Sequence, residues 1–274
     1  LTQSAVSNRI NRLESECGAR LVERIGKTAR ATPAGEWLLA CAGRMFDDLE
    51  STLQAVAGLA GEVAGRLVIG AGGTATTYLL ASPLAAFSHD HPRVEVRIVT
   101  GNTPDLVKQL VGAAIDVIIA TAPIKEAVVD QAAFFDDRLV CILPPDEPSA
   151  MKRVRPRDLA GRKIFLYEHG SLIREIVGDW FGDAAGAADI QEIGSAEAQK
   201  TFVRAGAGWS IISEMAVVDE AERGLLRVLP LTPPLTRRLI VAWRRDRADN
   251  PAIAAVRREL AEASRPGARN HRSD

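Results

Sequence analysis

One pattern recurs four times in the second part of the chain and constrains its fold more than any other feature. A short apolar run, typical of a buried strand, ends in glycine, a serine or threonine follows, and an amphipathic helical pattern begins. Strands that alternate with helices in this way predict parallel sheet covered by helices on both faces, which is an α/β fold. The four turns are Gly73-Thr74, Gly101 to Thr103, Gly170-Ser171 and Gly194-Ser195.

The spacing of the apolar runs predicts a doubly wound sheet in two lobes. Strands are expected at 66–71, 94–99, 115–119, 139–143, 163–167, 189–193, 209–212 and 239–243, and a helix from about 251 to 263 closes the fold. We assign residues 65–123 with 245–264 to a first lobe and residues 124–244 to a second. The tail, residues 265–274, is predicted to be disordered.

The four turns also predict where a ligand binds. In a doubly wound sheet the carboxyl ends of the strands gather at one crevice, where helix N-termini offer free N–H groups and a dipole that favours an anion. For a single turn, capping of the helix by the hydroxyl group is the simpler interpretation. Because four turns from two lobes face one crevice, we predict a small anionic ligand. The candidate contacts are Thr74, Thr76, Gly101, Asn102, Thr103, Ala122, Ser171 and Ser195.

The first part of the chain has a different pattern, a short helix with two unlike faces. Thr2 is a suitable N-cap, and an apolar stripe formed by Ala5, Val6, Ile10 and Leu13 has helical spacing. The opposite face carries side chains that suit base edges and phosphates, and a basic hairpin tip can follow the phosphate backbone as a wing. The candidate DNA contacts are Thr2, Gln3, Ser4, Ser7, Asn8, Arg9, Arg12, Lys27 and Arg30.

Charge is unevenly distributed along the chain. Residues 1–33 carry six cationic and three anionic side chains, a net charge of +3, whereas the whole chain has a net charge of −1. A basic N-terminal segment, which we call the head, joined to an acidic remainder, the body, suits contact with nucleic acid at one end. A solvated charged face is the alternative interpretation of the same residues.

A long helix is predicted from about residue 33 to residue 63, and we assign residues 34–64 as a linker. Its apolar residues recur every three or four positions, close to a heptad seam. They are Leu38, Ala42, Met45, Leu49, Val56 and Val63, widened by Phe46, Leu53 and Leu59. Packing on its own domain is one explanation of this stripe. The position of the helix between head and body favours pairing with a second copy of the chain.

These segments together resemble the LysR-type transcriptional regulators. TQSAVSNRINRLESECGARLVERIGKTARATPAGEWLL resembles the second half of the family's winged helix-turn-helix, so residues 1–33 are assigned to a partial DNA-binding domain. TYLLASPLAAF, GNTPDLVKQLVGAAIDVIIA and GSAEAQKTFVRAGAGWSIIS resemble its effector-binding domain, which is similar to periplasmic binding proteins. Two positions depart from the pattern: Asn8 replaces a common basic residue, and Trp209 either narrows the pocket or fills the core.

The resemblance implies a ligand-responsive regulator in the cytoplasm. The first helix would enter the major groove of promoter DNA, the wing would hold phosphate and the long helix would dimerise the heads. A small effector would bind between the lobes and change how the paired heads meet DNA. The expected assembly is a dimer of dimers that represses a nearby operon or activates it through RNA polymerase.

The position of Thr2 adds an alternative. Members of the family have roughly one and a half further helices ahead of this position, and Leu1 stands where Met would begin a chain. We therefore expect an incomplete head, through truncation or a misassigned start. A small-molecule-binding protein that does not bind DNA is then the alternative function.

Other classes of function have less support in the sequence. The chain has no run of about 18 apolar residues and no apolar signal core. Its three cysteines are scattered and its four histidines lack zinc-ligand spacing, so no metal or other cofactor is expected. Residues 70–74 lack the ending of a P-loop, and no Gly-x-Ser-x-Gly surrounds Ser171 beside His169. We therefore predict that the chain is not an enzyme.

Overall fold

The computed structural model describes residues 2–25, 28–59, 63–148 and 150–264. The chain divides into two compact units, residues 1–53 and 54–274, which are described one at a time. Two of the sequence-based predictions, the basic residue Lys27 and the disordered tail 265–274, lie outside the described residues.

The first unit begins with the predicted short helix, α1 (Gln3–Cys17). The Thr2 hydroxyl accepts a hydrogen bond from the Ala5 N–H at 3.4 Å, which confirms the predicted N-cap. Gly18 ends the helix with a φ of 65°, a left-handed conformation that glycine adopts at little cost. None of the residues of α1 is buried, and Val6 and Leu13 of the apolar stripe are each about two-fifths exposed.

The wing is an antiparallel hairpin of β1 (Val22–Ile25) and β2 (Thr28–Ala31). Thr32 joins it to the next helix, because its hydroxyl donates to the Arg20 carbonyl at 2.7 Å and accepts from the Gly35 N–H at 3.1 Å. Helix α2 (Pro33–Leu59) then begins with proline at its first position, as predicted.

Glu14 connects α1 to the wing. Its carboxylate accepts hydrogen bonds from the Leu21 N–H at 2.7 Å and the Val22 N–H at 3.0 Å. These donors, that of Val22 first, hold the pKa of Glu14 below its usual range, because they bind the ionised form. The link between α1 and the wing therefore depends on an ionised side chain.

Replacement of Glu14 by alanine is expected to make the Leu21 and Val22 amide protons exchange faster with solvent. Low pH should do the same in the unchanged protein. Because the folded-state pKa of Glu14 is lowered, its stabilising effect is present above the ordinary carboxyl range and is lost as pH falls through the folded-state pKa. Amide exchange measured by NMR tests this. Glu16→Ala is the matched control, since Glu16 pairs with the exposed Arg12 one turn along α1; equal exchange in both variants would contradict the prediction.

One residue of the predicted helical stripe does not belong to α2. The described helix ends at Leu59, and Val63 packs instead against the apolar core of the second unit. The seam pattern continued by chance into the chain that leads to the first strand of that unit. Within the helix, Met45 and Leu49 are exposed and Leu38 and Ala42 are half-buried.

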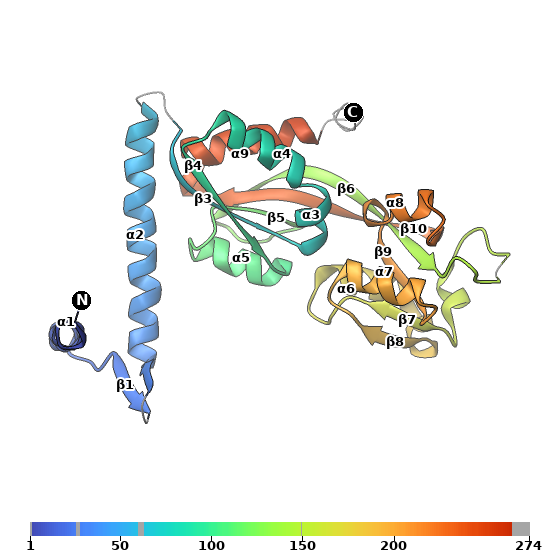
Figure 1. The fold of residues 1–274 in the computed structure, drawn as a ribbon, viewed down its shortest axis with the longest axis horizontal. Coiled ribbons are helices and arrows are strands. Elements are labelled where there is room, and N and C mark those ends of the chain that lie inside the picture. Colours follow the sequence, from blue (N-terminus) through green and yellow to red (C-terminus); the bar gives the residue numbers. More distant parts are fainter. Residues whose placement is uncertain (1, 26–27, 60–62, 149, 265–274) are drawn as a thin grey trace. The chain divides into compact units, whose positions relative to one another are not determined.

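The second unit contains one eight-stranded sheet in the order β4-β3-β5-β10-β6-β9-β7-β8 (Figure 1). The strands are β3 (Gly65–Ala71), β4 (Val94–Thr100), β5 (Val117–Thr121), β6 (Val129–Leu143), β7 (Lys163–Leu166), β8 (Asp189–Glu192), β9 (Trp209–Ser213) and β10 (Arg227–Arg244). β3 pairs in parallel with β4 and β5, and β7 pairs in parallel with β8 and β9. We call these two groups the first and second halves of the sheet.

Two strands are much longer than predicted and join the halves. β6 and β10 are antiparallel to each other and to their other neighbours, β9 and β5. Both strands run from one half of the sheet into the other. A boundary between two lobes therefore passes through these strands and does not lie in a loop. The predicted strands 139–143 and 239–243 are the apolar ends of these longer elements.

Helices cover both faces of each half, as expected for a doubly wound fold. They are α3 (Gly73–Tyr78), α4 (Ala81–Asp90), α5 (Thr103–Val111), α6 (Leu172–Phe181), α7 (Ala196–Arg204), α8 (Val218–Glu222) and α9 (Pro251–Ala263). In the first half, α4 and α9 lie on one face and α5 on the other (Figure 1). In the second half, α6 and α7 pack on opposite faces. The segment between β3 and β4 forms two helices, α3 and α4, which are separated at Leu79 and Leu80.

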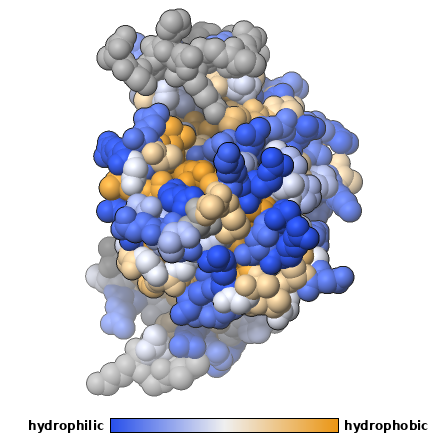
Figure 2. Space-filling model, turned by 90° about the vertical axis from the view of Figure 1, so that its right-hand side faces the viewer, coloured by the Kyte–Doolittle hydropathy of each residue, from blue (hydrophilic) through white to orange (hydrophobic). Residues whose placement is uncertain are grey.

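Apolar residues gather in four buried clusters inside the second unit. Figure 2 shows the end of this unit with hydrophilic residues over much of the face and smaller hydrophobic areas between them. Trp209, one of the two departures from the family pattern, is buried in the second half and donates its ring N–H to Glu147 at 3.2 Å. It fills the core and does not border the cavity described below.

Candidate functional site

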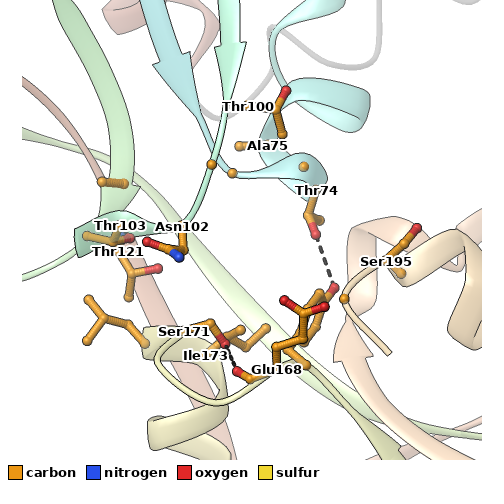
Figure 3. A pocket seen from close by; sticks show the side chains of 18 of the residues that line it. Thr74, Ala75, Thr100, Asn102, Thr103, Thr121, Glu168, Ser171, Ile173 and Ser195 are labelled. Carbon is orange, nitrogen blue, oxygen red and sulfur yellow. Dashed lines mark hydrogen bonds between the residues drawn. The ribbon is translucent and has the colours of Figure 1, made fainter. Parts of the chain in front are cut away.

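A cavity of about 460 Å³ lies at the carboxyl ends of the strands of the second unit. The first half contributes residues 72–75, 77–78, 100–103 and 119–121, and the second half contributes residues 167–169, 171–173 and 194–197. Arg237 and Leu239 of β10 complete the wall. The sheet topology thus brings together turns that are far apart in the sequence (Figure 3).

Three helices begin at this cavity with side-chain caps. Asn102 caps α5 by accepting from the Asp105 N–H at 3.0 Å. Ser171 caps α6 through the Arg174 N–H at 3.3 Å, and Ser195 caps α7 through the Ala198 N–H at 3.4 Å. Each helix therefore directs the positive end of its dipole toward the cavity.

Two of the predicted hydroxyl groups have other roles. The Thr103 hydroxyl accepts from the Thr121 N–H at 3.2 Å and ties α5 to the end of β5, because Asn102 already occupies the cap position. Thr74 lies inside α3, which has Gly72 as its N-cap residue and no side-chain cap. Both threonines remain on the cavity wall.

Thr74 forms a direct hydrogen bond between the halves. Its hydroxyl lies 3.2 Å from the Tyr167 hydroxyl, and Tyr167 follows β7 on the opposite side of the cavity (Figure 3). Burial raises the pKa of Tyr167, so this phenol stays protonated and can donate. A hydrogen bond between two neutral hydroxyl groups therefore helps to hold the two walls of the cavity together.

A second link between the halves surrounds Tyr78 at the end of α3. Its hydroxyl donates to the Glu197 carboxylate and accepts from the Lys200 ammonium at 2.9 Å. Lys200 is 4% exposed and also binds the Glu220 carboxylate at 2.7 Å and the Ala216 carbonyl at 2.8 Å. The ammonium is therefore fully engaged in holding α7, α8 and α3 together.

Arg237 lies at the base of the cavity. Its Nε donates to the Asp137 carboxylate at 2.7 Å, and the Ser213 hydroxyl donates to the other Asp137 oxygen at 2.6 Å. Asp137 is 1% exposed. Because a buried carboxylate holds one side of the guanidinium, the cation is fixed in place at the crossing of β6 and β10.

Two predicted contact residues do not line the cavity. The Thr76 hydroxyl donates to the Gly72 carbonyl at 3.1 Å, so its side chain is bound within its own helix. Ala122 follows β5, where its N–H donates to the Arg238 carbonyl at 2.8 Å, and it packs against the core beside α5. The other six, Thr74, Gly101, Asn102, Thr103, Ser171 and Ser195, are on the wall.

Sequence reasoning missed the charged and aromatic part of the wall. Tyr78, Tyr167, Glu168, Glu197 and Arg237 line the cavity but lie beyond the Gly-Ser/Thr turns that the prediction used. Tyr167 and Glu168 could have been found, because Tyr167 ends a predicted strand and Glu168 directly follows it, at the same edge as the turns. Arg237 could not, because its place depends on the register of β10 against β6.

Most of the candidate DNA contacts on the first unit are exposed to solvent. Gln3, Ser4, Asn8, Arg9 and Arg12 are exposed on α1, Thr2 is exposed at its cap and Ser7 is half-buried. Arg30 is exposed on β2 of the wing. Arg12 also pairs with Glu16 at 3.0 Å, one turn along the helix.

The catalytic alternatives do not have the required geometry. The Ser171 hydroxyl donates to the Glu168 carbonyl at 2.9 Å and the His169 ring pairs with Glu192, so these two neighbours do not form a nucleophile and base. Burial raises the pKa of the Cys141 thiol, which disfavours a reactive thiolate. In the described ranges, no cluster of three or more potential metal ligands occurs and no helix is long and apolar enough to cross a bilayer.

Comparison with known protein families gives two matches, one on each side of α2. A family model described as "LysR substrate binding domain" matches residues 60–265. Another, described as "Bacterial regulatory helix-turn-helix protein, lysR family", matches residues 1–36. The two matches correspond to the sheet-containing unit and to α1 with the wing.

Individual relatives and solved structures agree with these matches. The regulator CbbR of Xanthobacter flavus is 32% identical over 262 residues, which are 93% of this chain and 78% of CbbR. The RuBisCO operon transcriptional regulator of Allochromatium vinosum is 30% identical over 272 residues, 97% of this chain and 89% of that protein. A full-length OxyR variant from Pseudomonas aeruginosa has a TM-score of 0.72 at 26% identity, with 97% of this chain and 89% of that chain covered.

Proposed function

The chain belongs to the LysR family of transcriptional regulators, and on that premise we propose that its cavity receives a small anionic effector. The observation that carries this proposal is the convergence of α5, α6 and α7, whose N-termini meet at one cavity from both halves of the sheet. The dipole and the free backbone N–H groups at each N-terminus favour negative charge.

The proposal extends to DNA and to a second copy of the chain. The exposed polar face of α1 would read bases in promoter DNA, and Arg30 of the wing would contact phosphate. Helix α2 would pair with its counterpart, and two such dimers would form the tetramer that activates or represses an operon. A chain that binds the effector without DNA is the alternative, which a selection of operator sequences would exclude.

An effector in this cavity would touch both halves of the sheet. It can change the regulator only if it binds one arrangement of the halves more tightly than another. The Thr74–Tyr167 and Tyr78–Glu197 hydrogen bonds close the two walls on each other, and a ligand that displaces or reinforces them shifts that balance. Effector binding would in this way change the arrangement of the two halves of the sheet.

A fixed negative charge at the N-terminus of α6 is expected to abolish anion binding. Sulfate at about 100 times its dissociation constant should stabilise the unchanged protein by about 2.7 kcal/mol and raise its melting temperature by about 5–10 °C. Ser171→Asp keeps a good N-cap but occupies the site with a carboxylate, so this shift should disappear. Thermal unfolding with and without sulfate measures the effect.

The control adds the same charge to a helix that does not border the cavity. Asn250 caps α9 by accepting from the Ala252 and Ile253 N–H groups, and Asn250→Asp keeps that geometry. This variant should retain the full sulfate shift. Equal shifts in the Ser171→Asp and Asn250→Asp variants would show that sulfate binds elsewhere and would refute the proposed site.

A further inference from the structure

Glu168 is the cavity residue that the proposed anion site does not explain. It follows Tyr167 directly after β7, and Figure 3 shows its side chain directed toward the cavity between Ser171 and Ser195. A carboxylate in this position repels a second negative charge nearby. The wall therefore contains groups that attract an anion and a group that repels one.

The Glu168 carboxylate lies against the turn that begins α7. A Cβ atom added at Gly194 would come 2.7 Å from its Oε1 and 3.0 Å from its carboxyl carbon. Glycine at this position thus leaves the room that the carboxylate occupies. The N-terminal end of α7 already has an anion of the chain itself beside it, which favours α5 and α6 as the ends open to an anion from outside.

The other charges on the wall are compensated within the protein. Arg237 pairs with Asp137 at 2.7 Å, and Glu197 pairs with Lys200 at 2.9 Å. The His169 ring forms a hydrogen bond with the Glu192 carboxylate. Within the described part of the chain, no such ion pair compensates Glu168. Its exposed carboxylate therefore faces whatever enters the cavity, with only the N-terminal end of α7 beside it.

We propose that Glu168 restricts the effector to acids that also carry an ammonium or hydroxyl group. This inference rests on the proposed function and refines it. The acidic group would lie at the N-termini of α5 and α6, near Asn102 and Ser171, and the ammonium or hydroxyl group would donate a hydrogen bond to Glu168. Glu168 is exposed at the cavity wall, so an acid without a donor would displace water from its carboxylate without replacing the lost hydrogen bonds, which is unfavourable.

Three four-carbon acids that differ at one carbon atom test this assignment. Succinate has no donor at its second carbon, malate has a hydroxyl group there and aspartate has an ammonium group. The unchanged protein should bind aspartate and malate at least about tenfold more tightly than succinate. Glu168→Gln removes the charge, so it should bind succinate about tenfold more tightly than the unchanged protein and lose most of the preference for aspartate. Isothermal titration calorimetry of the full chain gives both ratios.

Two further variants make the result decisive. Gly194→Ala keeps the Glu168 carboxylate but forces it away from α7. The preference of this variant for aspartate over succinate should therefore also fall. Glu222→Gln removes an equal charge from the exposed surface of α8 and should keep the ratios of the unchanged protein. Identical ratios in Glu168→Gln and the unchanged protein would overturn this inference and leave the anion site intact. If the unchanged protein binds none of the three acids and shows no sulfate shift, the anion site itself fails.

Discussion

Replacement of both Leu49 and Leu53 by glutamate is expected to convert the regulator into monomers and to abolish tight operator binding. The two residues lie one turn apart on α2, and their side chains are 57% and 61% exposed. Met45 and Phe46 on the same helix are 73% and 71% exposed. A soluble protein rarely leaves so many large apolar side chains of one helix in water without a partner. Four glutamates in the paired helices would repel one another and lose the apolar contact.

The effect on DNA binding should be larger than any change at a single base contact. Two heads joined in a dimer bind the second half-site intramolecularly, which raises apparent affinity by about 10²–10⁴-fold. Loss of the dimer removes this gain, while each head keeps its own contacts. Sedimentation velocity measures the assembly, and fluorescence anisotropy with a selected operator measures the affinity.

A control for this variant changes two apolar residues of similar exposure elsewhere. Val128 and Val218 are 50% and 48% exposed and lie in the second unit. Val128→Glu with Val218→Glu should leave assembly and operator affinity unchanged. A Leu49→Glu and Leu53→Glu protein that remains dimeric would show that α2 is not the dimer interface.

Helices and strands of the second unit were predicted well where an apolar run is followed directly by turn residues. Ser171 and Ser195 are caps because each follows a strand and glycine and precedes an amphipathic helix, and the structure confirms both. Asn102, and not Thr103, occupies the N-cap position of α5. Its side-chain oxygen accepts from the Asp105 N–H, so the cap lies one residue earlier than the hydroxyl pattern suggests. Such a shift of one residue cannot be read from composition.

The long strands were missed because their middle sections are polar or contain proline. Residues 130–138 of β6 include Asp136 and Asp137, and β10 contains proline at 230, 233 and 234. Apart from the short apolar run at residues 132–135, these segments lack an apolar strand signal. Their register shift between Pro230 and Leu235 and their cross-strand ion pairs arise only when both strands are present. The part of the site that depends on this pairing, Arg237, was therefore beyond sequence reasoning.

Replacement of Asp137 by alanine is expected to lower the free energy of unfolding by about 3–5 kcal/mol, a large fraction of the stability of a typical domain. Asp137 is the buried acceptor for both Arg237 and Ser213. Its removal would leave the Arg237 side chain, which is 9% exposed, as a cation without its carboxylate. Urea unfolding followed by circular dichroism measures the change.

The neighbouring residue provides a matched control for this second prediction. Asp136 pairs with Arg238 in the same register of β6 and β10, but both side chains are more than three-fifths exposed. Asp136→Ala should therefore leave the unfolding midpoint nearly unchanged, because water solvates the remaining arginine. Combining Asp137→Ala with Arg237→Met should recover much of the lost stability, since no unpaired buried charge remains. Equal losses in the Asp136 and Asp137 variants would mean that burial of the Asp137–Arg237 pair does not determine the stability of the strand crossing beneath the cavity.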